Sequence, residues 1–385
     1  MDFSKIRVLV TDSGGKQPYA MICGLKDIGC HVTVICGSKY DTCYVSNKPD
    51  ERILNTKYKE NNDDKFRWIL SLVETGKYDV LMPIGEMSTD FITQHETDLK
   101  KYVKIACAPR DVYIKCYNKQ ITFDQAMKSG VPCPYTRKSD QDIEDYLNKC
   151  KFPIIIKPRQ GIGSIGFHKF KDIEEFRSYL ANPSFNVDDY VVQEFVNFEH
   201  RIGTLIFMDK QQRVCTSYAT DVLRWFPLDA GSAVFLGSTD SPRLLHETAK
   251  LLKDLEWQGF AAACFMIDKE TGDPKLLEIN GRIPASVHLA YMLGFNISRQ
   301  FLELVYDEEV TRYPENAKFG KYLRHFDTDI AWFLKSPNRF RAKPSWFSWK
   351  DTEEVLFTWD DPKPFFYQFY QKLRYYRTIM KNKQH

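Results

Sequence analysis

The stretch IIIKPRQGIGSIGF (residues 154–167) joins a run of three isoleucines to Lys157 and then to a loop that contains Gly161, Gly163 and Gly166. An ammonium group at the end of an apolar strand needs an anionic partner, because burial of an unpaired charge is costly. Glycines let another group approach the main chain closely, and main-chain N–H groups bind phosphate oxygens. The stretch therefore predicts that Lys157 and the glycine loop hold phosphate together.

The three glycines match the pattern G-x-G-x-x-G, which occurs in several kinds of loop. A dinucleotide-binding loop needs a helix directly after the glycines, but here residues 167–170, FHKF, alternate like a strand. In a P-loop the lysine follows the glycines, whereas Lys157 precedes them. A strand, a glycine loop and a second strand fit a flap that folds over phosphates. A plain hairpin turn is the alternative, and it leaves Lys157 unexplained.

The composition is that of an ordinary globular protein. The chain has 385 residues, 43% hydrophobic and 27% charged, which suits two or three domains. A net charge of +3 gives no electrostatic case for a nucleic-acid partner. No apolar stretch approaches the roughly 18 residues that span a bilayer, and the first residues lack the apolar segment of a signal peptide. The ten cysteines are scattered without a C-x-x-C pair, which predicts reduced thiols in a cytoplasmic protein.

Strand and helix patterns alternate over residues 1–110 and predict a parallel, doubly wound α/β sheet. Its apolar runs are residues 5–12, 30–36, 78–85 and 103–108. Residues 111–310 predict an α+β region with antiparallel sheets, in which a helix over 111–129 ends at Gly130 and residues 260–280 form a hairpin. Residues 311–385 are rich in aromatic and basic residues.

A second polar cluster ends the apolar run PKLLEINGR (residues 274–282). Side chains alternate along a strand, so Glu278, Asn280 and Arg282 are expected on one face. Carboxylate and amide oxygens are ligands suited to Mg²⁺, and an arginine binds phosphate or carboxylate through two N–H groups. A salt-bridged strand end at the surface explains these residues equally well.

The order of these segments resembles that of the ATP-grasp superfamily over about residues 5–305. It is closest to carboxylate–amine ligases whose domains are similar to the large chain of carbamoyl-phosphate synthase. The resemblance implies a parallel pre-ATP-grasp domain followed by a two-part ATP-grasp domain with antiparallel sheets. The implied parts are the pre-ATP-grasp domain (1–110), a small subdomain with the glycine flap (111–190), a large subdomain with the metal site (191–310) and a C-terminal extension (311–385).

The resemblance also assigns a site for ATP. The residues that match its phosphate-binding lysines and mobile flap are Lys119, Lys157, Gly161, Gly163, Ser164 and Gly166. The residues that match the strand whose main chain reads the adenine edge are Gln193, Glu194, Phe195 and Val196. Glu199 resembles the acid that binds ribose, although its spacing is one residue short of the family pattern.

The metal implied by the resemblance is Mg²⁺, or alternatively Mn²⁺, with Glu278 and Asn280 as ligands. Family members usually carry a further acidic or amide ligand about 14 residues before the glutamate, and Cys264 stands there in this chain. A thiol is a poor ligand for Mg²⁺. Three consequences are open: Asp268 substitutes for the ligand, the metal site is weakened, or the protein binds nucleotide without turning it over.

The implied reaction activates a small carboxylate as an acyl-phosphate and joins it to an amine, with release of ADP and phosphate. Besides Lys157, the implied catalytic residues are Arg224 and Arg282, which resemble arginines that hold the acceptor or the acyl-phosphate. Ser286 and His288 are further candidates for contact with the acceptor. The pattern does not identify the carboxylate or the amine. The resemblance also implies a possible homodimer, which is common in the family.

Three other functions compete with the ligase. They are an inactive nucleotide-binding regulatory module, a nicotinamide-dependent oxidoreductase and a structural scaffold. The residues TDSGG (11–15) are no full dinucleotide fingerprint, and an oxidoreductase leaves Glu278 and Asn280 without a role. For the tail KPFFYQFYQKLRYYRTIMKNK (363–383), a helix packed against the rest of the protein is favoured over association with a membrane or a partner.

Overall fold

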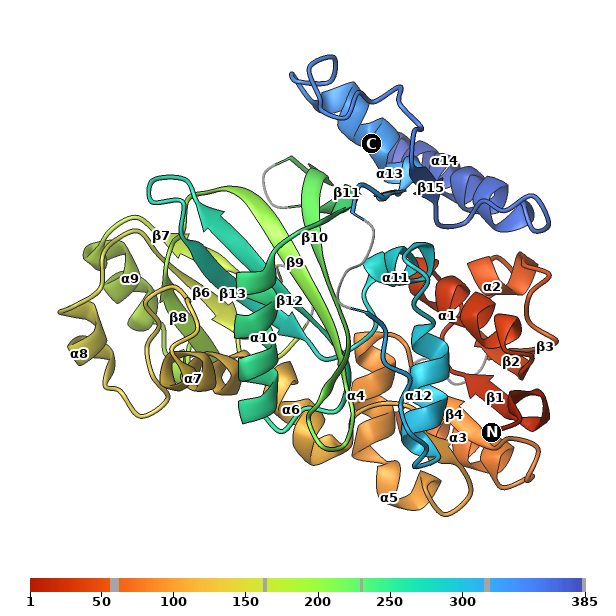
Figure 1. Ribbon diagram of the computed structural model, residues 1–385. Coiled ribbons are helices and arrows are strands. Elements are labelled where there is room, and N and C mark those ends of the chain that lie inside the picture. The colour runs from red at the N-terminus through yellow and green to blue at the C-terminus, as the bar shows by residue number, and fades with distance from the viewer. Residues whose placement is uncertain (56–61, 162–164, 229–230, 315–318, 383–385) are drawn as a thin grey trace. The chain divides into compact units, whose positions relative to one another are not determined.

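The computed structural model describes residues 1–385 except 56–61, 162–164, 229–230, 315–318 and 383–385 (Figure 1). It divides into two compact units. The first unit comprises residues 1–107, 220–240 and 282–385, and the second comprises 108–219 and 241–281. The four-part division expected from the sequence stays a prediction, although the structure groups 220–240 and 282–310 with the N-terminal residues rather than with the large subdomain.

The first unit contains a parallel sheet in the order β3–β2–β1–β4–β5 (Figure 1). Its strands are β1 (Arg7–Val10), β2 (His31–Cys36), β3 (Glu51–Leu54), β4 (Val80–Met82) and β5 (Lys104–Ile105). The helices that connect them are α1 (Lys16–Asp27), α2 (Thr42–Val45), α3 (Asn62–Val73), α4 (Glu86–Gln94) and α5 (Glu96–Leu99). The strand order reverses between β1 and β4, so the predicted doubly wound sheet is confirmed. Strand β3 was not predicted, because its sequence ERIL is short and half charged.

The first unit also holds much of the C-terminal half. Its further strands are the later part of β10 (Val214–Phe226), β11 (Ser232–Thr239), β14 (Tyr322–Arg324) and β15 (Thr352–Glu354). Its further helices are α11 (His288–Met292), α12 (Ile297–Val305), α13 (Phe326–Lys335) and α14 (Lys363–Asn382). Helix α14 contacts α2 and α13, and its Phe365 ring lies 6.0 Å from that of Phe326. The start of the tail thus packs against the unit, as expected.

The second unit contains two antiparallel sheets. The smaller sheet has the order β7–β6–β8, with β6 (Ile154–Pro158), β7 (His168–Phe170) and β8 (Tyr190–Glu194). Tyr146 of α8 (Ile143–Leu147) and Phe176 of α9 (Ile173–Leu180) pack on Ile154 and Ile156 of β6. The strands of the second sheet in this unit are, in order, β13 (Pro274–Asn280), β12 (Gly259–Asp268), β9 (Phe198–Met208) and the first part of β10.

The helices of the second unit are α6 (Arg110–Tyr117), α7 (Lys119–Ser129), α8 (Ile143–Leu147), α9 (Ile173–Leu180) and α10 (Pro242–Asp254). Three short 3₁₀ helices complete the described elements of the two units: Phe3–Lys5, Val187–Asp189 and Ala285–Val287. The predicted single helix over 111–129 was wrong, because it is two helices that meet at Asn118. The Asn118 side chain accepts a hydrogen bond from the Gln120 N–H and caps α7. This break places Lys119 in the first turn of a helix.

Gly166 is constrained both by its main chain and by a neighbour. Its φ is +76°, and a Cβ atom there would lie 2.7 Å from Cγ of Pro158. We expect Gly166→Ala to lower the free energy of unfolding by about 2–3 kcal/mol, because left-handed strain of about 1 kcal/mol adds to a steric clash. Urea unfolding would measure the loss. The control is Gly76→Ala, where φ is +67° and nothing lies within 4 Å, and an equal loss in both variants would contradict the clash.

Candidate nucleotide and metal site

Lys157 joins the two sheets of the second unit. Its ammonium group donates a hydrogen bond to the main-chain oxygen of Leu277, with an N···O distance of 2.9 Å. The pairing of β12 with β13 skips Leu277, since residues 264 and 265 face residues 278 and 276. Such a bulge leaves the extra residue unpaired in the ladder. Lys157 is therefore held beside the residue that precedes Glu278.

Charges of both signs surround the Lys157 ammonium group. Its pKa is lowered to about 8, chiefly by burial and also by Lys119, while the Glu278 carboxylate acts in the opposite direction. The ammonium group also lies 4.5 Å from the centre of the Phe123 ring. Lys119 Nζ donates to the main-chain oxygen of Gly161 at 2.9 Å, so the second lysine reaches the glycine loop. Two ammonium groups and the loop thus provide the cationic surroundings that phosphates require.

We expect Lys157 to make stability depend on pH. The folded protein loses this proton near pH 8, whereas an unfolded chain loses it near pH 10.4. Between these values the unfolded chain binds more protons, so stability rises with pH across the window. The free energy of unfolding is measured with urea at pH 7.0 and at pH 9.5 for the wild type and for Lys157→Met. The free energy of the wild type minus that of the variant should be about 1–2 kcal/mol larger at pH 9.5 than at pH 7.0, after a discount for partial exposure. Lys171→Met, at a side chain that is 80% exposed, serves as the control and should show no such change.

Glu278 and Asn280 lie two residues apart on β13, and Asn280 Nδ2 donates to Glu278 Oε1 at 3.0 Å. Cys264 faces Glu278 across the ladder. Burial raises the pKa of the Cys264 thiol to about 12, and the Glu278 carboxylate adds to this effect. A protonated thiol is not a metal ligand, so the two hard-oxygen side chains remain.

The donor set fits Mg²⁺ that takes the rest of its shell from water and phosphate oxygens. Over the part of the chain that the structure describes, no group of three or more His, Cys, Asp or Glu residues could hold a metal ion. Asp268, the predicted substitute ligand, ends β12 four residues after Cys264, which is about 13 Å along a strand. Its Oδ1 accepts from the N–H groups of Glu270 and Thr271, at 2.8 and 3.0 Å. The structure thus gives Asp268 a place in a hairpin turn and does not bring it to Glu278.

In the predicted adenine segment the main-chain N–H groups differ in whether a described residue accepts from them. The N–H groups of Glu194 and Phe195 donate to carbonyl oxygens of the protein. The Gln193 side chain is buried and donates to Thr136 Oγ1 at 2.7 Å. No described residue accepts from the N–H of Val196. Val196 is therefore the residue of this segment that can donate to an adenine edge.

The structure describes some, but not all, of the remaining residues that were predicted to bind the nucleotide. Gly161 and Gly166 lie between β6 and β7, which are antiparallel, so the expected strand, glycine loop and strand is present. Gly163 and Ser164 lie outside the described residues. Glu199, the predicted ribose ligand, lies on β9 with a side chain that is 55% exposed, and its carboxylate is 3.6 Å from Nδ1 of His200.

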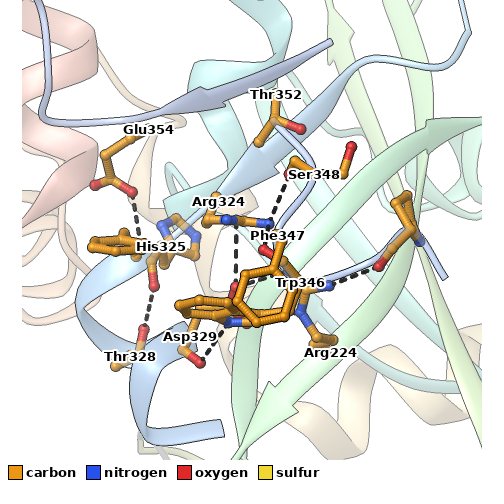
Figure 2. A network of polar contacts seen from close by, with 12 residues as sticks. Arg224, Arg324, His325, Thr328, Asp329, Trp346, Phe347, Ser348, Thr352 and Glu354 are labelled. Carbon is orange, nitrogen blue, oxygen red and sulfur yellow. Dashed lines mark hydrogen bonds and ion pairs between the residues drawn. The ribbon is translucent and has the colours of Figure 1, made fainter. Parts of the chain in front are cut away.

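The guanidinium group of Arg224 is bound to another side chain of the protein. Its Nε and Nη2 donate to the two carboxylate oxygens of Asp329, both at 2.8 Å, and both side chains are almost fully buried (Figure 2). A second buried arginine, Arg324, lies 3.3 Å from the same carboxylate. The geometry thus places Arg224 in a buried ion network of the first unit and gives no support to the predicted contact with an acceptor.

Arg282 lies beyond β13, which ends at Asn280, so the expected face shared with Glu278 does not continue to it. Its Nε donates to Glu86 Oε2 at 3.4 Å, and Glu86 opens α4 after β4. The predicted His288 pairs with Glu353, with Nε2 and the carboxylate oxygen 3.3 Å apart. Ser286 lies in the 3₁₀ helix 285–287.

Comparisons with known proteins agree with this geometry. A family model described as an ATP-grasp domain matches residues 116–286. The alpha-aminoadipate–LysW ligase LysX of Saccharolobus solfataricus is 27% identical over 197 residues, which are 49% of this chain and 70% of that protein. Biotin carboxylase from Campylobacter jejuni shares the fold with a TM-score of 0.68 and 15% identity, over 84% of this chain and 75% of the other.

N5-carboxyaminoimidazole synthetase from Staphylococcus aureus also shares the fold, with a TM-score of 0.64 and 14% identity, over 87% of this chain and 86% of the other. The expected combination of a parallel sheet with antiparallel sheets is confirmed by the sheets of this chain, and its fold is shared with these structures. The glycine loop lies inside the matched ATP-grasp domain, so a nicotinamide-dependent oxidoreductase is not needed to explain it. Residues 116–286 of the chain therefore form an ATP-grasp domain.

Proposed function

We propose that the chain is an ADP-forming carboxylate–amine ligase that uses ATP with Mg²⁺. The observation that carries this proposal is the link from Lys157 to the carbonyl of Leu277, which sets a phosphate-binding lysine beside the Glu278–Asn280 pair. The family and the LysX relative support it, since LysX is named as a ligase of alpha-aminoadipate and LysW. An L-amino acid ligase from Bacillus licheniformis shares the fold, with a TM-score of 0.60.

In this reaction the protein supplies position and charge. The ammonium groups of Lys157 and Lys119 offset the negative charge of the phosphates as the terminal phosphoryl group moves to the carboxylate. The Val196 N–H donates to the adenine edge. Mg²⁺ held by Glu278 and Asn280 would neutralise further phosphate charge.

The acyl-phosphate is the product of the first step, and attack by the amine then releases phosphate and forms the amide. Acyl-phosphates react with water, so water must be excluded from the site until the amine attacks. Arg282 stays a candidate for holding the acceptor carboxylate.

A second function, nucleotide binding without turnover, is favoured by Cys264 at the position of the expected third ligand. The two functions differ in what they release. A ligase produces ADP and phosphate when a carboxylate is present, whereas a binding module responds to Mg-ATP with added stability alone.

The experiment incubates the purified chain with Mg-ATP, hydroxylamine and single carboxylates, chiefly amino acids and dipeptides. Hydroxylamine captures an acyl-phosphate as a hydroxamate, so each carboxylate can be tested before its amine is known. We expect ADP and hydroxamate in equal amounts with some carboxylates, and neither with Lys157→Met. A thermal shift with Mg-ATP but no ADP would assign the binding module, and no shift would overturn both proposals.

A homodimer and a cytoplasmic location stay predictions. The biotin carboxylase domain of Hydrogenobacter thermophilus 2-oxoglutarate carboxylase, which shares the fold with a TM-score of 0.66, is described as a dimer. Light scattering of the purified chain would determine its own assembly.

A further inference from the structure

The segment between α13 and β15 has an unusual charge. Residues 334–350, LKSPNRFRAKPSWFSWK, contain five basic residues and no acidic residue. The basic residues are Lys335, Arg339, Arg341, Lys343 and Lys350. The whole chain carries a net charge of only +3, so positive charge is concentrated here. We refer to residues 334–350 as the basic aromatic segment.

The basic aromatic segment also exposes large apolar side chains. Leu334, Phe340, Phe347 and Trp349 are 67%, 74%, 63% and 48% exposed. The ring of Phe333 lies 5.5 Å from that of Phe340 and 5.7 Å from that of Phe347. Two of these exposed rings therefore lie beside Phe333, and Leu334 is the next residue in the chain. Large side chains that gather at a surface usually mark an interaction site.

The main chain beneath these side chains is held in place (Figure 2). Arg324 Nη2 donates to the carbonyl oxygens of Trp346 and Ser348, at 2.9 and 3.1 Å. Trp346 Nε1 donates to the carbonyl oxygen of Asp329 at 3.3 Å. Because buried groups fix the backbone, the outward rings are presented by an ordered support and need little reorganisation to bind.

We propose that the basic aromatic segment binds the surface of an anionic lipid bilayer. Aromatic and leucine side chains enter the interfacial region of a bilayer, and lysine and arginine are attracted to anionic headgroups. A segment with five cations and no anion fits a surface of uniform negative charge. Among the described residues no helix is long and apolar enough to cross a membrane, so the association is peripheral.

A matched control lies within the same unit. Trp359 is 90% exposed, yet it is followed by Asp360 and Asp361 and lies outside the basic aromatic segment. If exposed aromatic rings bound the bilayer non-specifically, Trp359 would contribute as much to binding as Phe340. Binding to an anionic bilayer predicts that Trp359 contributes little. Asp361 is buried and the exposed Asp360 carboxylate is paired with Lys48, so this site has no excess of positive charge to attract the surface.

The test is co-sedimentation of the full chain with vesicles of phosphatidylcholine alone or with about a third phosphatidylglycerol. We expect binding to the anionic vesicles only, weakened by added salt. The double variant Leu334→Ser/Phe340→Ser should lower the partition coefficient at least about tenfold, because the inserted apolar area is lost. Arg341→Glu/Lys343→Glu should lower it about 25-fold or more, at roughly fivefold for each basic residue. Trp359→Ala should leave it unchanged.

Each variant is also checked for its thermal shift with Mg-ATP, which reports the fold independently of vesicle binding. Failure of the wild type to bind anionic vesicles at low salt would overturn the proposal. Equal binding to phosphatidylcholine, or an equal loss in Trp359→Ala, would overturn it as well. A concentration-dependent dimer that disappears in Leu334→Ser/Phe340→Ser, without vesicle binding, would assign the surface to a second copy of the chain instead.

Discussion

Glu278→Gln should abolish the ability of Mg²⁺ to strengthen ATP binding and should lower turnover at least about 10³-fold. Glutamine keeps the size of the side chain and can still accept from Asn280, but it no longer supplies a charged ligand. A bound metal ion contributes several kcal/mol of charge stabilisation in phosphoryl transfer, and each 1.36 kcal/mol is tenfold in rate. ATP affinity with Mg²⁺ and with EDTA, measured by titration calorimetry, gives a result that does not depend on knowing the substrates.

The contrast between the two titrations is what identifies a metal ligand. Glu278 also repels phosphate, so without metal the variant should bind ATP as tightly as the wild type or more tightly. A general defect in folding would weaken binding in both conditions. Glu270→Gln, at an exposed carboxylate in the turn of the same hairpin, is the control and should behave as wild type. A full Mg²⁺ effect in Glu278→Gln would show that the metal site lies elsewhere.

The sequence predicted best where the reason for a structure is local. The alternation around the glycine loop was enough to expect β6, a loop and β7, because strand periodicity needs only neighbouring residues. The parallel sheet followed in the same way from apolar runs separated by amphipathic helices. The division between α6 and α7 had a local signal too, since Asn118 is a preferred helix cap, but the continuous helical pattern around it hid the break.

The predictions that the geometry does not support depend on partners distant in the sequence. Arg224 was expected at the acceptor site because of the family resemblance, and no pattern could reveal Asp329, which lies 105 residues away. Cys264 was singled out only by its spacing of 14 residues before Glu278, and the structure pairs these two residues across the ladder next to the bulge at Leu277. Asp268 was offered by residue type alone, whereas the rise of a strand puts it too far along β12.

Asp329→Asn should cost about 3–5 kcal/mol of unfolding free energy, the largest stability effect that we expect in the chain. Arg224 and Arg324 both pair with this carboxylate, and the three side chains are at most 2% exposed (Figure 2). Burial lowers the pKa of Arg324 to about 10, so its guanidinium group is still charged at neutral pH. Removing the negative charge leaves two buried cations without compensation, which is more costly than the pair itself is stabilising.

A second arginine–aspartate pair gives a matched control. Arg7 Nε and Nη2 donate to the two oxygens of Asp79, at 3.0 and 2.8 Å, in the geometry that Arg224 has with Asp329. The side chains of this control pair are 44% and 30% exposed, so water screens the charge that remains and Asp79→Asn should cost about 1 kcal/mol or less. Urea unfolding of both variants would compare the same chemistry at two degrees of burial. Similar losses of unfolding free energy in the two variants would mean that burial does not make the Arg224–Asp329–Arg324 network more important than an exposed ion pair. Contacts other than this network would then hold residues 334–350 to β10 and β14.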